Sequence, residues 1–339
     1  LAQEIKNTSR LIDTSRPVLQ IHWGGGTPNY LEIRQVEFLW ETINRYFSVD
    51  ANAEVSIEIN PRYINRDYIN SLRSIGFNRI SFGIQDFDPQ VQLAVNRIQP
   101  EKMLFDAMDW IKQANFSSVN VDLIYGLPKQ TPASFATTLK KVAQLRPERI
   151  ALYAYAHLPE RFKPQRKIHA EELPQAAEKI EMLSIAISTF LSAGYVYVGM
   201  DHFALPTDPL AIAKRQGRLH RNFQGYSTQP DCDLIALGVS SIGRVGSTYS
   251  QNAKTLDEYY DHINQGHLPV VRGLALTSDD IVRRAVIMGL MCQGELQFEA
   301  IDLAYMIDFR TYFADELKAL KVYAAEGLVE VDQDCIQVT

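Results

Sequence analysis

The chain has 339 residues, of which 46% are hydrophobic and 22% charged, proportions typical of a folded globular protein rather than a disordered or fibrous one. Its net charge of -6 excludes a general attraction to nucleic acids or anionic membranes, and its apolar runs are too short to span a bilayer. The three cysteines are too few and scattered for a disulfide framework or a metal motif, so we expect a cytoplasmic protein.

From about residue 18, short β-branched or aromatic segments alternate with amphipathic ones. A first strand is predicted at 18–23 and a helix at 31–47, where apolar residues recur at helical spacing. Since parallel strands are joined by crossover helices, this alternation predicts a parallel α/β sheet. Further strands are predicted at 54–59, 79–84, 118–125, 149–156 and 195–200.

Nearly every predicted strand ends in glycines or in a polar residue. In (β/α) barrels the active site is assembled from the carboxyl ends of several strands, whereas a doubly wound sheet concentrates its chemistry at one switch point. We therefore predict a partial (β/α) barrel over residues 1–250. The strand-end residues are Gly24, Gly25, Gly26 and Thr27, followed by Glu58, Gln85, Asp122, His157, Asp201 and His202.

After residue 250 the pattern changes to helices that end in a predicted hairpin at 328–338. This order is typical of a small, mainly helical, winged-helix-like domain, a class that often binds DNA. Residues 279–339, however, contain twelve Asp or Glu and five Lys or Arg, and a phosphate-binding surface needs the opposite sign. We therefore expect residues 251–339 to have a packing or lid role. Helices are predicted at 256–264, 279–292, 300–308 and 311–326.

Three consecutive glycines, Gly24 to Gly26, follow the first predicted strand directly. Without Cβ atoms the backbone can approach a ligand and offer its N–H and C=O groups. The spacing is neither the GxGxxG dinucleotide fingerprint nor a P-loop. A tight strand-to-helix turn is the alternative, but three glycines exceed what a turn requires, so we favour a ligand-binding loop.

Polar and apolar residues alternate in the strand that contains Glu58. Ser56, Glu58 and Asn60 share one strand face, and a polar face turned into a barrel is costly unless it is paired or hydrated. We interpret Glu58 as a binding carboxylate, with an exposed strand end as the alternative. Gln85 and Asp122 repeat the pattern on later strands. We interpret this recurrence, rather than any single residue, as the indication of a binding site.

His157 and the pair Asp201–His202 are ambiguous, because a strand-end histidine can be an acid, a base or a hydrogen-bonded spacer. No zinc site is expected there, since no cysteine or carboxylate lies at metal-ligand spacing. Two basic segments, 161–169 and 210–230, contain no acidic residue. Guanidinium groups bind carboxylates in a bidentate way, so these segments fit a substrate with several carboxylates; ordinary surface charge is the alternative.

Motifs along almost the whole chain resemble the oxygen-independent coproporphyrinogen III dehydrogenases, a family of radical-SAM enzymes. GGGTP alone would indicate only the wider radical-SAM superfamily, whereas GMDHFA (199–204) with LHRNFQGYSTQ (219–229) points to this family. The other motifs are HWGGGTPNYL (22–31), EVSIEINP (54–61), NRISFGIQDF (78–87), NVDLIYGLPKQTP (120–132), YAHLP (155–159) and DLIALGVSSIG (233–243).

The resemblance implies a partial (β/α) barrel that holds a [4Fe-4S] cluster on a CxxxCxxC loop and two molecules of S-adenosylmethionine (SAM). In the family, the reduced cluster cleaves one SAM to a 5′-deoxyadenosyl radical, which removes a hydrogen atom from the β-carbon of a propionate. CO2 then leaves and an electron acceptor takes the remaining electron. Two propionates of coproporphyrinogen III become the vinyls of protoporphyrinogen IX.

Matching positions imply cofactor-binding roles for individual residues. Gly25, Glu58 and Ile242 would contact the cluster-bound SAM. A substrate with several carboxylates agrees with the second basic segment, in which Arg218 and Arg221 are the candidate substrate-binding residues; no catalytic residue is assigned. The residues implied for the second SAM are Gly26, Thr27, Gln85, Arg97, Asp122 and Ala156.

The cluster cysteines are expected upstream of Leu1, because Cys232, Cys292 and Cys335 do not form the CxxxCxxC motif. The chain is therefore expected to be a fragment that binds no cluster and has no turnover by itself, with its C-terminal domain cut short. The intact enzyme is expected to be a monomer that uses an unidentified electron donor and acceptor and has neither a nucleic-acid nor a membrane partner.

Three alternatives stay open from the residues alone. A haem chaperone would share the barrel and the SAM loops, but that family carries a His-Asn…Tyr-Trp element where this chain has 221–226, RNFQGY. A (β/α)-barrel lyase or aldolase with a Schiff-base lysine needs that lysine at a strand end, and no predicted strand ends in one. A winged-helix regulator is opposed by the acidic charge of the last domain.

Overall fold

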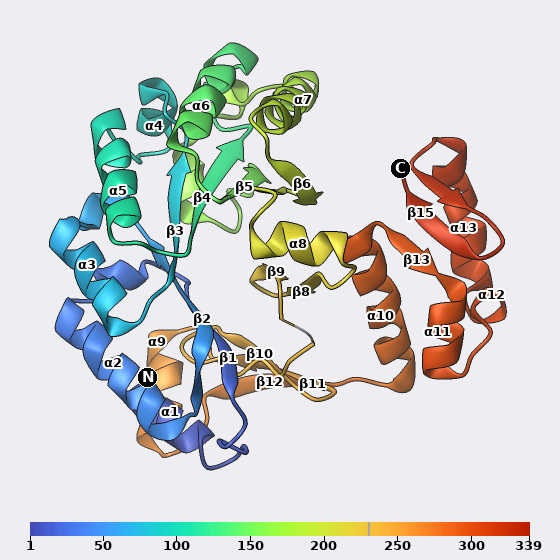
Figure 1. Cartoon of the computed structure of the whole chain (residues 1–339), viewed down its shortest axis with the longest axis horizontal. Helices are drawn as coiled ribbons and strands as arrows, with labels where there is room; N and C mark the ends of the chain where they lie inside the picture. Colours follow the sequence, from blue (N-terminus) through green and yellow to red (C-terminus); the bar gives the residue numbers. More distant parts are fainter. Residues whose placement is uncertain (230) are drawn as a thin grey trace. The chain divides into compact units, whose positions relative to one another are not determined.

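The structure is a computed structural model that describes residues 1–229 and 231–339. The chain forms two compact units: Arg16–Ala211, and a second unit in which Leu1–Ser15 joins Ile212–Thr339. Figure 1 labels most of their helices and strands. The predicted domain boundary after residue 250 stays a prediction, and Pro230, the last residue of the second basic segment, lies outside the described residues.

The Arg16–Ala211 unit is built on a seven-stranded sheet of order β1-β2-β3-β4-β5-β7-β6. The first five strands are parallel and lie in chain order, which confirms the predicted partial (β/α) barrel. The strands are β1 (Val18–Trp23), β2 (Val49–Ile59), β3 (Arg79–Gln85), β4 (Ser118–Tyr125), β5 (Arg149–Ala154), β6 (Val196–Gly199) and β7 (His202–Ala204).

The end of this sheet differs from the prediction. The strand predicted at 195–200 is β6, which pairs antiparallel with β7, and β7 in turn pairs antiparallel with β5. Met200 has a left-handed backbone, with φ of 43°, so the chain reverses at once and no crossover helix follows. Because β6 and β5 are both antiparallel to β7, β6 runs in the same direction as β5, and Asp201 follows its carboxyl end as predicted. His202 instead is the first residue of β7.

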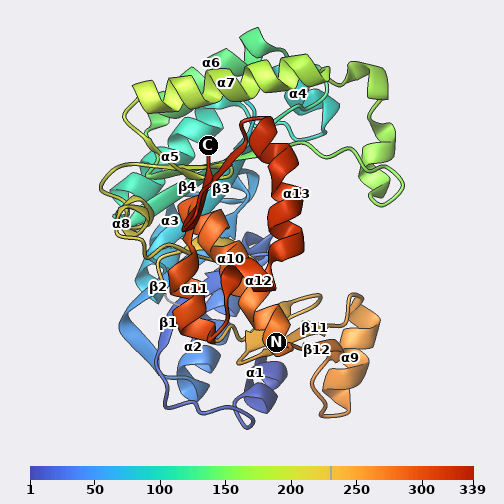
Figure 2. The same cartoon turned by 90° about the vertical axis from the view of Figure 1, so that its right-hand side faces the viewer.

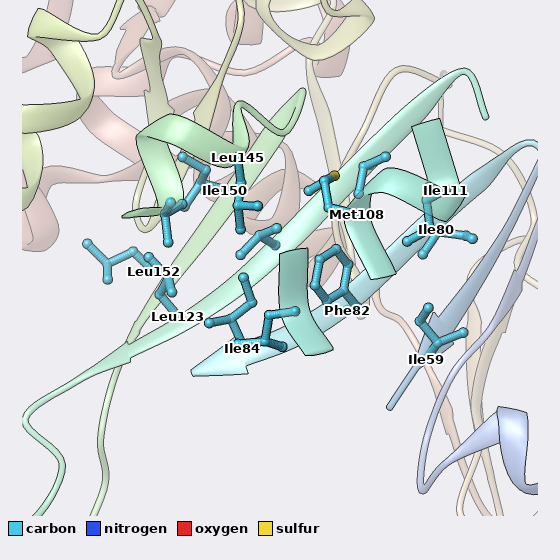
Figure 3. Close-up of a cluster of buried hydrophobic side chains, with 14 of the residues drawn as sticks. Ile59, Ile80, Phe82, Ile84, Met108, Ile111, Leu123, Leu145, Ile150 and Leu152 are labelled. Atoms are coloured by element: carbon cyan, nitrogen blue, oxygen red, sulfur yellow. The ribbon is translucent and has the colours of Figure 1, made fainter. Parts of the chain in front are cut away.

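Helices cover one face of the sheet and bury its apolar residues (Figures 1 and 2). Alternate strand residues such as Ile57, Phe82 and Leu123 are fully buried against them in one core, which Figure 3 shows in part. Burial of this apolar face stabilises the unit and turns the polar face of each strand inward. The helices are α2 (Ile33–Tyr46), α3 (Arg66–Ile75), α4 (Pro89–Ala94), α5 (Glu101–Gln113), α6 (Pro132–Leu145) and α7 (Ala176–Ser192), with short 3-10 helices η1 (Pro28–Tyr30), η2 (Pro61–Tyr63), η3 (Lys163–Lys167) and η4 (Ala170–Glu172).

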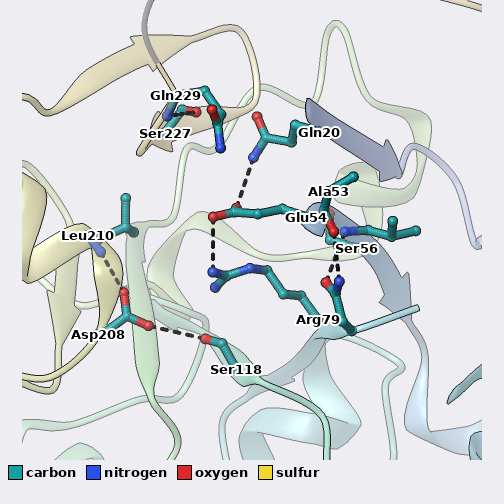
Figure 4. Close-up of polar contacts among 12 residues, drawn as sticks. Gln20, Ala53, Glu54, Ser56, Arg79, Ser118, Asp208, Leu210, Ser227 and Gln229 are labelled. Carbon is teal, nitrogen blue, oxygen red and sulfur yellow. Dashed lines mark hydrogen bonds and ion pairs between the residues drawn. The ribbon is translucent and has the colours of Figure 1, made fainter. Parts of the chain in front are cut away.

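Two ion pairs lie on the polar face toward the amino ends of the strands, and Figure 4 shows the one between Arg79 and Glu54. Arg79 Nη2 lies 3.0 Å from Glu54 Oε1, and Gln20 Nε2 donates a hydrogen bond to the other oxygen of that carboxylate. Arg149 Nε lies 2.9 Å from Asp208 Oδ1. These four charged side chains are at most 15% exposed and their charges balance. The charges at this end of the sheet are therefore paired within the protein.

The second unit contains an antiparallel sheet of order β10-β11-β12 and a hairpin of β8 and β9. These strands were not predicted, because they bury few residues and show little alternation. Helix α1 contributes Glu4, whose buried carboxylate accepts hydrogen bonds from Gly238 N, Asn252 Nδ2 and Tyr259 Oη. The elements are α1 (Ala2–Thr8), β8 (His220–Asn222), β9 (Gly225–Ser227), β10 (Ile242–Val245), β11 (Thr248–Asn252), α9 (Leu256–Asn264) and β12 (Val270–Ala275); α8 (Pro209–Arg215) links the two units along the chain.

The end of the chain has a core of its own, in which Phe298 stacks on Phe309 with ring centroids 4.3 Å apart. The predicted hairpin is confirmed as β14 and β15, and β13 adds a third strand to it. A mainly helical, winged-helix-like arrangement is thus present. Its elements are α10 (Ser278–Gln293), β13 (Glu295–Gln297), α11 (Phe298–Tyr305), α12 (Phe309–Tyr312), α13 (Ala314–Ala325), β14 (Val329–Val331) and β15 (Cys335–Val338).

Candidate functional site

A cavity of about 150 Å³ lies at the carboxyl ends of β2, β3 and β4. Ser81 and Gly83, which were not predicted as site residues, also line it. A larger hollow of about 530 Å³ lies on the outer side of the unit between α2 and α3, but none of the predicted site residues line it. The predicted residues that the smaller cavity brings together are Gly26, Thr27, Glu58, Gln85, Arg97 and Asp122.

The glycine run after β1 forms a turn that other residues could not adopt without strain. Gly25 and Gly26 have φ of +79° and +65°, in the left-handed region that favours glycine. A Cβ on Gly24 would lie 2.5 Å from His22 Nε2 and 2.8 Å from Glu58 Oε1. Around Gly25 and Gly26 an added Cβ would meet nothing within 4 Å, so the backbone there is open to a ligand.

Glu58 is held from two sides. His22 Nε2 lies 3.1 Å from its Oε1, and Gly25 N donates a hydrogen bond to its Oε2. The hydrogen bond from His22 lowers the pKa of Glu58, against the opposing effect of burial, so the carboxylate is ionised at neutral pH. His22 was missed from the sequence, although it follows Gln20 by two residues and so shares the polar strand face.

Asp122 is the second carboxylate of the cavity. Ser81 Oγ and Asn120 Nδ2 donate hydrogen bonds to it, at 3.2 and 2.8 Å. Burial, and next the negative charge of Glu58, raise the pKa of Asp122 to about 6. Two carboxylates thus lie in one cavity and repel each other, and a cationic ligand would reduce this repulsion.

Gln85 and Arg97 supply the complementary polar groups. Gln85 has a left-handed backbone, and its buried Oε1 has no hydrogen-bond partner within the described chain. Arg97 Nη2 donates to the carbonyl oxygen of Gly83. Burial lowers the pKa of Arg97, and the nearby charge of Arg62 acts in the same direction. A buried acceptor without a partner suggests that a ligand donor completes the site.

Other predicted residues lie outside this cavity. β5 ends at Ala154, so Ala156 and His157 lie in the following loop, where Gln165 Nε2 donates to the Ala156 carbonyl. Ile242 belongs to β10 of the second unit.

The two candidate substrate-binding arginines are also in the second unit. Arg218 Nε donates a hydrogen bond to Gln216 Oε1. The Arg221 guanidinium lies 4.8 Å from the ring centroid of Tyr226. The Nη1 of Arg221 is buried without a hydrogen-bond partner among the described residues.

Among residues 1–229 and 231–339, no three His, Cys, Asp or Glu side chains gather as a metal site would require. Cys232, Cys292 and Cys335 are free thiols. No helix of the described chain combines the length and the apolar character that crossing a bilayer demands.

Comparisons with known proteins cover both units. The Radical SAM superfamily model matches residues 1–142, and the HemN C-terminal domain model matches residues 276–339. An oxygen-independent coproporphyrinogen III oxidase of Synechocystis sp. is 52% identical, over 100% of this chain and 74% of that protein. The Escherichia coli protein of the same name is 48% identical, with the same two coverages.

One solved structure matches the whole fold. It is titled "Coproporphyrinogen III oxidase (HemN) from Escherichia coli is a Radical SAM enzyme", and it superposes with a TM-score of 0.98 at 47% identity. The match covers 100% of this chain and 78% of the solved chain.

Proposed function

We propose that this chain, which belongs to the family of oxygen-independent coproporphyrinogen III oxidases, is the core of an enzyme that converts two propionates of coproporphyrinogen III to vinyls, giving protoporphyrinogen IX. These are the enzymes called dehydrogenases above. The observation that carries the proposal is 52% identity along the whole chain to a relative of that name. A haem chaperone is not favoured, because the relatives compared above are all named oxidases.

The cavity fits the polar groups of SAM. The ammonium and sulfonium groups of SAM are cations, and the carboxylates of Glu58 and Asp122 line the cavity. The free oxygen of Gln85 can accept a hydrogen bond, and Arg97 can bind the carboxylate of SAM. About 150 Å³ is well below the roughly 300–1,000 Å³ of a typical small-molecule site, so the cavity takes one polar end of the ligand.

Two SAM molecules share these residues in our proposal. Gly25, Glu58 and Ile242 are assigned to the one at the cluster. The residues assigned to the second SAM are Gly26, Thr27, Gln85, Arg97, Asp122 and Ala156. All of them except Ala156 line one cavity, which supports this assignment.

A [4Fe-4S] cluster and SAM, when bound, supply the hydrogen-atom abstraction that starts the loss of CO2 from a propionate. The residues of this chain bind SAM and the substrate and orient them. Ionised Glu58, fixed by His22, holds a cationic group in place. Asp122, with a pKa of about 6, adds a second negative charge at neutral pH, and a cation beside it lowers that pKa further.

The propionates of the substrate are anions, and we assign Arg218 and Arg221 to them. The buried, unpartnered Nη1 of Arg221 supports this assignment, because a guanidinium in that state lacks an acceptor that a carboxylate can supply. The aromatic ring of Tyr226 fixes the plane of this guanidinium.

The partners and location are proposed on the same basis. A reduced cluster requires an electron donor, and the electron left after CO2 departs requires an acceptor. The free cysteines suit a cytoplasmic location. Net charge and the acidic last domain support the absence of nucleic-acid and anionic-membrane partners, and we propose a monomer.

The test is anaerobic turnover by the complete protein that carries this chain. With a reductant, SAM and coproporphyrinogen III, mass spectrometry should detect loss of CO2 from two propionates and formation of protoporphyrinogen IX. Glu58→Ala should abolish this product and weaken SAM binding. A wild-type protein that binds SAM and its cluster but leaves the propionates intact would overturn the proposal.

A further inference from the structure

Strand β3 is irregular where it reaches the cavity. Gly83 pairs with Asp122 of β4, and Gln85 pairs with Leu123, so Ile84 is one residue more than β4 can match. Such a bulge redirects side chains and is frequent beside active sites. The left-handed backbone of Gln85, with φ of 66°, is unfavourable for a non-glycine residue and persists only where its surroundings hold it.

A buried amide holds this bulge from behind. Gln99 is fully buried, and its Nε2 donates hydrogen bonds to the carbonyl oxygens of Gly83 and Ile84, at 3.2 and 2.9 Å. An amide nitrogen has two hydrogens, so both of its donors are used on the bulge. Neither glutamate nor methionine could make these two bonds.

The oxygen of the same amide holds the arginine of the cavity. Arg97 Nε donates to Gln99 Oε1 at 3.1 Å, while Arg97 Nη2 donates to the Gly83 carbonyl at 3.1 Å. One edge of the guanidinium is thereby fixed to the bulge. Its Nη1 has no acceptor within the described chain and is available to a ligand, since Arg97 lines the cavity.

A second buried glutamine fixes the first. Gln92 Nε2 donates to the carbonyl oxygens of Asp86 and Gln99, and Gln92 Oε1 accepts from Gln99 N at 2.8 Å. The backbone of Gln99 is therefore tied to the segment that follows the bulge. Every polar group in this chain of amides has a partner, which favours one rigid arrangement.

We propose that Gln99 is a positioning residue of the second SAM site, which it serves without touching the ligand. Its amide sets the positions of Gln85 and Arg97 together. As a result, Gln85 Oε1 and Arg97 Nη1 can bind the same SAM molecule. Gln99 does not line the cavity. The inference rests on the proposed function, in which Gln85 and Arg97 bind SAM.

The experiment measures SAM binding by equilibrium dialysis, with the complete protein purified anaerobically and loaded with its cluster. Wild type should bind two equivalents. Gln99→Met, which keeps the side-chain length but has no amide, should weaken one of them about tenfold, as loss of a hydrogen bond to a charged group does, and leave the other unchanged. Should Gln99→Met fail to fold, Gln99→Leu, which also lacks the amide and adds no charge, takes its place with the same expectation.

Asn78 offers a matched control at the opposite end of β3. Its amide also bridges two backbone groups, since Nδ2 donates to Ala53 O and Oδ1 accepts from Val55 N. Asn78→Ala should lower the thermal unfolding midpoint, as Gln99→Met does, and leave both SAM affinities unchanged. Equal losses of affinity in the two variants would reduce Gln99 to a purely structural residue and overturn the inference.

A double-mutant cycle tests whether Gln99 acts through Arg97. In an Arg97→Met background, Gln99→Met should weaken SAM binding about threefold or less, because only Gln85 remains to be positioned. An undiminished tenfold effect, or no effect in either background, refutes the inference. A wild-type protein that binds no SAM at all refutes the proposed function instead.

Discussion

Replacing Asp122 by asparagine should stabilise the protein. Burial and the charge of Glu58 raise the pKa of Asp122 from 3.8 to about 6. At roughly 1.4 kcal/mol per pH unit, this difference is worth about 3 kcal/mol against the ionised folded state. Asparagine can accept only one of the two hydrogen bonds now donated by Ser81 and Asn120, which costs about 1 kcal/mol. The net gain above pH 7 is therefore about 2 kcal/mol.

The sign of the pH dependence follows from the raised pKa. The folded state holds the proton on Asp122 more tightly than the unfolded state does, so this stabilisation is complete below pH 3.8 and is lost as the pH rises through about 6. Asparagine has no such dependence. The difference in unfolding free energy between Asp122→Asn and wild type should grow by about 1.4 kcal/mol between pH 5 and pH 7, then level off.

Urea unfolding of this chain at pH 5, 6, 7 and 8 measures the difference. Tryptophan fluorescence is the appropriate signal, because Trp23, Trp40 and Trp110 all pack against the core of the Arg16–Ala211 unit. Asp109→Asn, on the exposed side of α5, removes the same charge and should change stability by less than about 0.5 kcal/mol. If the Asp122→Asn difference does not vary with pH, or if the variant is less stable at pH 8, the reasoning fails.

Three further predictions concern ligand binding. Glu58→Ala should weaken SAM binding at least tenfold in dialysis, because a hydrogen bond to a charged group is worth about 1.5–3 kcal/mol, with an unchanged circular dichroism spectrum as control. Gly83→Ala should abolish binding of one SAM, since the added Cβ would clash with Gln85 Nε2, lie 2.9 Å from Arg97 Nη2 and displace both side chains; retained stoichiometry would contradict this. Arg218→Ala and Arg221→Ala should each raise the KM for porphyrinogen by about tenfold or more, and an unchanged KM would assign that arginine to the surface.

The sequence predicts the polar strand ends because strand periodicity fixes which side each residue faces. Ile57 is buried against the helices, and Glu58, its neighbour, lines the cavity, as alternation requires. Asp122 follows the same rule. For such residues the fold class and the strand register suffice to place the side chain at the site.

Other parts of the site depend on features that alternation does not encode. The bulge at Ile84 and the amide of Gln99 depend on a register shift between β3 and β4, and the position of Arg97 was implied by the family resemblance alone. β12 was missed because all six of its residues are exposed. β7 was missed because the reversal that leads into it depends on one left-handed residue, Met200.

The buried carboxylate of Glu4 should hold the second unit together. It is 1% exposed and accepts hydrogen bonds from Gly238 N, Asn252 Nδ2 and Tyr259 Oη. Glu4→Ala leaves Gly238 N and Tyr259 Oη without their acceptor, at about 1–3 kcal/mol each, so we expect a loss of at least about 2 kcal/mol. Asn252 Nδ2 still donates to Gly238 O and Ser241 Oγ.

Two spectroscopic signals distinguish a loss of stability in the second unit from a loss of stability in the whole chain. All three tryptophans lie in the other unit, so fluorescence reports Arg16–Ala211 alone, whereas far-ultraviolet circular dichroism reports the whole chain. In Glu4→Ala the dichroism transition should move to lower urea, while Glu299→Ala, exposed on α11, should leave it in place. If the urea midpoint seen by fluorescence stays unchanged while the dichroism midpoint falls, the two units unfold separately. If both midpoints fall, the two units unfold together. A dichroism transition that does not move would show that Glu4 is dispensable.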